Sequence, residues 1–131
     1  MRTFVAFCIA FLLAAVAVAG NAHFVGAPTF TINGDTASVS GKVAGLGNVP
    51  QIHVTLSGDA QCVNRGGQDP EAANKETFTA EGDFPVQNGK SLFSLALTAV
   101  LQPPCSPPMH VAWSNLSVVV TAADGTSLVY P

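Results

Sequence analysis

Most of the chain beyond residue 28 alternates between hydrophobic and polar residues, with turn residues at short intervals. The clearest example is the stretch 51–62, where Ile52, Val54 and Leu56 share one parity and His53 lies on the other. Strict alternation of this kind is typical of a β-strand with one buried face. The remaining stretches that fit a strand are 29–32, 37–43, 77–86, 91–101, 110–121 and 127–130.

Two of these stretches depart from simple alternation. The stretch 91–101 is apolar on both faces, because Leu92 joins the outer side, so we expect a strand in the middle of a sheet. In 110–121 the inward parity of Trp113 conflicts with that of Leu116. A register shift near Asn115 would place both side chains in the core.

Turn signals separate the strands, and no plausible helix follows residue 22. Asn-Gly, Asp-Gly and Gly-Leu-Gly-Asn are sequences that favour tight turns, and they occur at 33–34, 45–48, 88–89 and 124–125. About seven short strands with regular turns predict a single antiparallel β-sandwich of immunoglobulin-like architecture. A small closed barrel is the alternative.

The beginning of the chain is different. Arg2 precedes an uncharged apolar run over 4–19, which ends among small residues. This pattern predicts a secretory signal peptide over 1–22 and a β-sandwich domain over 23–131. Cleavage after Ala19 is an alternative to cleavage after residue 22. A membrane anchor also remains open, since the run is near the lower limit of about 17 residues for a bilayer span.

The charge and the cysteines refine this picture. The chain has five Lys and Arg residues against eight Asp and Glu, for a net charge of −3. This gives no electrostatic reason to bind nucleic acid or anionic lipid, and we expect no membrane insertion after signal cleavage. Cys8 leaves with the signal, so Cys62 and Cys105 are expected to form a disulfide in a secreted or cell-envelope protein.

The loop over 64–75 is the most distinctive polar stretch. Asn64, Arg65, Asn74 and Lys75 could recognise a carboxylate, a sugar hydroxyl or the backbone of a partner. The structural alternative is that the Asn side chains only satisfy backbone groups of the loop. A phosphate-binding loop is excluded, because no Gly-Lys-Ser/Thr follows.

This loop also carries a resemblance to a known group. The sequence Cys-Val-Asn-Arg-Gly-Gly-x-x-Pro-x-x-x-Asn-Lys over 62–75 resembles a segment of small secreted proteins from actinobacteria and fungi. His23-Phe24, the Gly-Leu-Gly-Asn at 45–48 and Cys105 fit the same outline. The resemblance implies a secreted β-sandwich and adds no catalytic residue.

The three histidines suggest an alternative function. Cleavage after residue 22 would make His23 the first residue, and its amine and imidazole could then bind copper. His53 or His110 would complete the site, with Met109 as a soft ligand. No His-x-His or similar metal-binding spacing supports this alternative.

Catalytic motifs are missing from the sequence. There is no Gly-x-Ser-x-Gly, and no spacing suggests a pair of catalytic carboxylates. Trp113 has inward parity, which favours core packing over a sugar-stacking platform. The sequence therefore predicts a non-catalytic binding or surface-interaction module without a cofactor, whose partner is an extracellular protein or glycan. A copper protein is the main alternative, and a structural envelope component is another.

Overall fold

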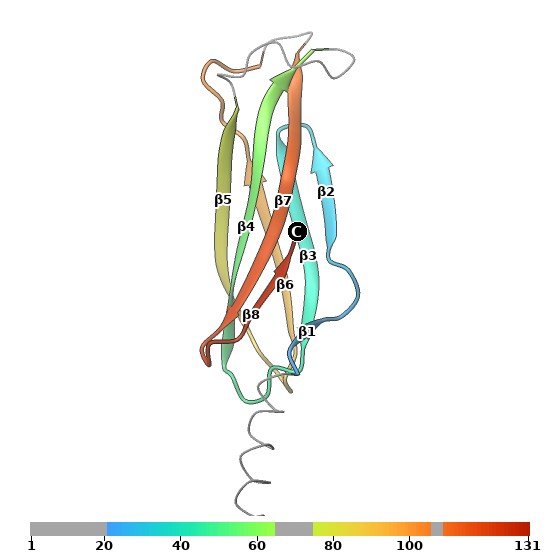
Figure 1. Ribbon diagram of the computed structural model, residues 1–131, viewed down its shortest axis with the longest axis vertical. Coiled ribbons are helices and arrows are strands. Elements are labelled where there is room, and N and C mark those ends of the chain that lie inside the picture. Colours follow the sequence, from blue (N-terminus) through green and yellow to red (C-terminus); the bar gives the residue numbers. More distant parts are fainter. Residues whose placement is uncertain (1–20, 65–74, 106–108) are drawn as a thin grey trace, which may run out of the picture.

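The computed structural model describes residues 21–64, 75–105 and 109–131 (Figure 1). Nearly all of the predicted signal peptide lies outside these ranges, as do Arg65 and Asn74. The described residues form eight strands and no helix. The strands are β1 (His23–Phe24), β2 (Thr29–Asn33), β3 (Thr36–Ala44), β4 (Gln51–Val63), β5 (Glu76–Pro85), β6 (Ser91–Thr98), β7 (His110–Ala122) and β8 (Ser127–Tyr130).

The strands build two antiparallel sheets that lie face to face. In sheet A, β3 pairs with β1 and β2 on one side and with β6 on the other. Sheet B has the order β5-β4-β7-β8 and lies in front of sheet A in Figure 1. The predicted all-β sandwich is confirmed, and the short β1 is the strand that the sequence pattern missed.

The core lies between the sheets and follows the alternation of the sequence. Ile52, Val54 and Leu56 of β4 are fully buried. They face the inner side of sheet A, where Val39 and Phe93 belong to the same hydrophobic cluster. Burial of this apolar surface is the main favourable term in folding, at about 25 cal/mol per Å² removed from water.

The expected disulfide is present. Cys62 and Cys105 are bonded, with their Cα atoms 5.5 Å apart. Trp113 points inward as its parity predicts, and its ring contacts that of Phe78 at a centroid distance of 6.2 Å. Its indole N–H donates to the Gly34 carbonyl at 3.3 Å, which links sheet B to the β2–β3 turn of sheet A.

The register shift near Asn115 is also confirmed. The pairing of β4 with β7 is irregular between Ser57 and Asp59. Asn115 has a positive φ of 55°. A Cβ atom on Gly58 would lie 2.5 Å from Cδ2 of Leu116, so the leucine side chain covers the glycine on the inner side of the sheet. The shift therefore lets both Trp113 and Leu116 face the core.

The expected central position of the strand over 91–101 is wrong. β6 ends at Thr98 and pairs only with β3 among the described strands, so it forms an edge of sheet A. Its outer apolar residues are therefore in solvent, with Leu92 70% exposed and Val100 just beyond the strand 62% exposed. The outer face of β6 is therefore apolar although no described strand or layer covers it.

No helix in the described part of the chain is long and apolar enough to cross a membrane.

Candidate functional site

The predicted ligand loop leaves the sandwich at the end where the disulfide lies. Asn64 directly follows β4 and is half-buried, whereas Lys75 directly precedes β5 and is exposed. Arg65 and Asn74 lie outside the described residues. Cys105 belongs to the connection between β6 and β7, so the disulfide ties the base of this second connection to the end of β4.

A polar cluster on the outer face of sheet B lies next to this end. Thr77 donates to Oδ1 of Asp59 at 2.6 Å, and the Asn115 amide donates to Oδ2 of the same carboxylate at 2.9 Å. These two hydrogen bonds, Thr77 foremost, lower the pKa of Asp59, and the charge of Lys75 acts in the same direction. The cluster therefore holds an ionised carboxylate in a fixed orientation beside the loop.

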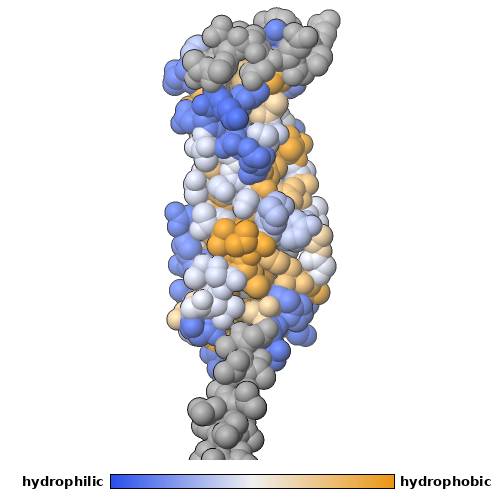
Figure 2. Space-filling view, viewed as in Figure 1, coloured by the Kyte–Doolittle hydropathy of each residue, from blue (hydrophilic) through white to orange (hydrophobic). Residues whose placement is uncertain are grey.

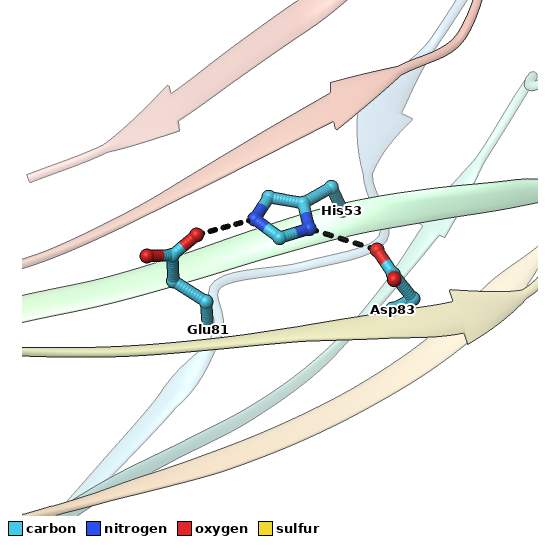
Figure 3. Close-up of polar contacts among 3 residues, drawn as sticks. All are labelled: His53, Glu81 and Asp83. Carbon is cyan, nitrogen blue, oxygen red and sulfur yellow. Dashed lines mark hydrogen bonds and ion pairs between the residues drawn. The ribbon is translucent and has the colours of Figure 1, made fainter.

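A second cluster centres on His53, further along the same face (Figure 3). The imidazole lies between two carboxylates of β5, with Nδ1 2.8 Å from Oδ1 of Asp83 and Nε2 2.7 Å from Oε1 of Glu81. Asp83 is the cross-strand partner of His53, and Glu81 occupies the adjacent outward position of β5. The register of β4 with β5 is what brings the three side chains together.

The geometry of this cluster favours a protonated histidine. A neutral imidazole carries one N–H and can donate to only one carboxylate, whereas the imidazolium donates from both nitrogens. The hydrogen bond to Asp83, followed by that to Glu81, raises the pKa of His53 above its ordinary value of 6.5. About half of each side chain is exposed, so the ion pairs are screened by solvent.

The rest of this face is mixed in character. Figure 2 shows it largely hydrophilic or neutral, with a hydrophobic patch over β7 and β8. Val119 and Val129 pair with one another on this outer side, and Val129 is 60% exposed. No aromatic side chain from the described strands joins them on the outer face, so this face lacks a platform for stacking on sugars.

The three histidines do not meet in the fold. His53 and His110 both lie on the outer face of sheet B, but His110 pairs with Val63, ten residues further along β4. At about 3.3 Å per residue the separation is roughly 33 Å. His23 belongs to sheet A and hydrogen-bonds through Nδ1 to the Asn21 carbonyl at 2.7 Å.

His23 therefore lies in a different sheet from His53 and His110, and the fold adds no support for the copper alternative. His53 is also engaged at both ring nitrogens, which leaves it no lone pair for a metal. Within residues 21–64, 75–105 and 109–131 no group of three or more His, Cys, Asp or Glu side chains is arranged to hold a metal ion.

The opposite end of the sandwich carries an open hollow of about 540 Å³. It lies between the β3–β4 and β5–β6 connections, and Lys90 is the one charged residue in its lining. Its walls otherwise consist of glycines, two asparagines and small apolar residues. Such a shallow hollow offers little to orient a ligand, so it is a weaker candidate than the disulfide end.

The sequence pattern predicts neither of the two polar clusters. The alternation over 51–62 correctly places His53 on the outer side of its strand, and Asp59 has the same parity. The partners of both residues come from β5 and from the irregular part of β7. Which residues of a neighbouring strand lie beside His53 or Asp59 depends on the pairing register of the two strands. The alternation along one strand does not determine that register. The alternation Glu81-Gly82-Asp83 was the available signal, since it puts two carboxylates on one face of a strand.

No protein-family model matches this chain, and no curated protein sequence matches it.

Proposed function

We propose that this protein is an exported, non-catalytic binding module whose partner is an extracellular protein or glycan. The partner contacts the end of the sandwich where the disulfide joins β4 to the β6–β7 connection. The observation that carries the proposal is the disulfide at this end: Cys62, near the end of β4, is fully buried and bonded to Cys105 of the β6–β7 connection.

The rigid end of β4 favours recognition of a partner by the connection over residues 64–75. Val63, the last residue of β4, is only 4% exposed, so the backbone enters the loop from a well-packed position. Binding residues are concentrated on loops that a rigid scaffold positions, because less conformational entropy is lost when a partner binds. Asn64 and Lys75, at the two ends of the 64–75 connection, therefore start from defined positions.

The chemistry near this end suits a polar partner. Lys75 supplies a cation, and Asn64 supplies amide donors and an acceptor. Asp59 uses one hydrogen bond on each oxygen within the protein, and a carboxylate has about four lone-pair positions, so acceptor capacity remains. Donors and acceptors of this kind match sugar hydroxyls or a peptide backbone.

Export is supported by the chain's chemistry. A disulfide persists in oxidising compartments such as the extracellular space or the cell envelope. The apolar run at the start of the chain fits a secretory signal over residues 1–22. The immunoglobulin-like character and the kinship with small secreted proteins of actinobacteria and fungi belong to the same proposal.

The test is a binding measurement on the purified domain. The protein is applied to a glycan array and to insoluble chitin, cellulose and peptidoglycan, and bound protein is quantified. The double variant Asn64→Ala with Lys75→Ala should reduce the affinity at least about tenfold, because it removes the donors at both ends of the loop.

The chain offers a matched control at the opposite end. Asn48 and Lys90 are exposed in the connections that line the hollow there, and changing both to alanine removes the same two residue types. The control should bind like the unchanged protein. Equal losses in the two double variants would refute the disulfide end as the site, and release of soluble sugar from any substrate would refute a non-catalytic role.

A further inference from the structure

β6 is an edge strand with one side unoccupied by any described strand. It pairs with β3 over residues 91–98, and none of the other described strands pairs with its second side. An edge of this kind presents a row of backbone N–H and C=O groups that can pair with another chain. Proteins normally protect such edges with charges, proline or short length.

The other described edges carry these protections and β6 does not. β5 bears charges at Glu81 and Asp83 and ends at Pro85. β1, β2 and β8 are short, with two, five and four residues. By contrast, the sequence 91–101 contains neither a charged residue nor a proline.

The outer side of this edge is also apolar at both ends. Leu92 and Val100 are 70% and 62% exposed, which are the two highest values among the large hydrophobic residues that the structure describes. Ala96 lies midway between them on the same face and is exposed. The chain thus leaves two of its large apolar side chains in water along one strand edge, where a strand paired to that edge would cover them.

The sequence of this face is chemically symmetric. Its outward residues, in order, are Leu92, Ser94, Ala96, Thr98 and Val100. If a second copy pairs antiparallel with Ala96 on the twofold axis, each Leu92 lies opposite Val100 and each Ser94 lies opposite Thr98. Apolar side chains then meet apolar ones, hydroxyls meet hydroxyls, and the smallest residue occupies the axis, which are favourable cross-strand pairs.

Neighbouring registers lose this match. With Leu95 on the axis, for example, Leu92 would face Thr98, and Ser94 would face Ala96. A twofold contact also brings each residue near the axis against its own copy, so a charged residue there would repel itself. The uncharged stretch 91–101 contains no such residue.

We propose that the protein forms a symmetric dimer through antiparallel pairing of two β6 edges with Ala96 on the twofold axis. The pairing joins the two copies of sheet A into one continuous sheet and covers Leu92 with Val100 of the second copy. The dimer proposal rests on the β6 edge alone and does not rest on the proposed binding function.

Sedimentation velocity over a wide concentration range tests the dimer. The unchanged protein should show a concentration-dependent shift from monomer to dimer. Ala96→Lys and Ala96→Glu each place two like charges at the axis, so each variant alone should dimerise more weakly by about a hundredfold or more. An equimolar mixture of the two variants should recover the dimer, because lysine then faces glutamate.

Thr31→Lys is the matched control. Thr31 of β2 and Ala96 of β6 are the two neighbours of Ser38 on opposite sides of β3, so both variants add a lysine to the same outer face. Thr31→Lys should dimerise like the unchanged protein. The proposal is overturned if the unchanged protein is monomeric at every concentration, if both lysine variants behave alike, or if the mixture stays monomeric.

Discussion

At the scale of single residues, the protonation of His53 is decided by its two neighbours on β5. Both ring nitrogens face carboxylate oxygens, at 2.8 Å and 2.7 Å, so the folded protein favours the imidazolium. The unfolded chain lacks this arrangement and binds the proton less tightly. Proton binding by His53 is thereby coupled to folding.

The coupling predicts a pH-dependent stability. Because the pKa of His53 is raised in the folded state, its contribution is complete below the ordinary value of 6.5 and is lost as pH rises through the folded value. Urea unfolding between about pH 6 and pH 9 should therefore show the unchanged protein losing stability relative to His53→Gln as pH rises. The difference between the two proteins isolates His53 from other titrating groups.

Two further variants control this prediction. Asp83→Asn should lower the pKa of His53, measured by NMR titration, more than Glu81→Gln does, because the hydrogen bond to Asp83 is the larger cause of the shift. A histidine that titrates at or below 6.5 in the unchanged protein would contradict the arrangement of Figure 3.

At the scale of strands, the pairing of β3 with β6 depends on one small residue. Gly41 lies opposite Phe93, and a Cβ atom at Gly41 would come within 2.6 Å of Cζ and 3.0 Å of Cε2 of the ring. Phe93 is only 3% exposed and also contacts the rings of Phe24 and Phe84. The ring therefore has little room to move away.

Gly41→Ala should destabilise the protein by about 1–3 kcal/mol, because the added methyl group overpacks the core against Phe93. Chemical denaturation measures the loss. The double variant Gly41→Ala with Phe93→Leu should lose less than the sum of the two single losses, since the shorter side chain makes room for the methyl group. Simple additivity would show that the glycine is not covered by the ring.

The alternation of hydrophobic and polar residues along the chain was sufficient to predict most strands and the irregular position in β7. The parity change between Trp113 and Leu116 requires an irregular position between them, and Asn115 tolerates a positive φ better than most residues. The position of β6 was not predictable in this way. An apolar outer face has the same sequence pattern whether another layer, a second molecule or solvent lies against it.

At the scale of the whole molecule, the disulfide joins positions 43 residues apart. Replacing Cys62 and Cys105 together with alanine should reduce the free energy of unfolding by roughly 4 kcal/mol, because the unfolded chain gains loop entropy. Urea unfolding measures the loss, and the intact mass without reduction confirms the bond in the unchanged protein.

Reduction of the unchanged protein is the control for this prediction. Unfolding in the presence of a thiol reductant should give a loss close to that of the double alanine variant, since both treatments release the same constraint. A double variant as stable as the oxidised protein would show that the bridge contributes no net stability.

The start of the described chain and the disulfide lie at opposite ends of the long axis of the molecule, which decides how the protein can be attached to a surface. β1, where the described chain begins, lies at the end opposite the disulfide, and the C-terminus lies part-way along the side (Figure 1). A tether placed just ahead of Asn21 would therefore hold the molecule upright on a sensor surface, with the end that carries the Cys62–Cys105 disulfide facing the solution. The same orientation would let a support-bound copy reach a partner without steric interference from its own attachment.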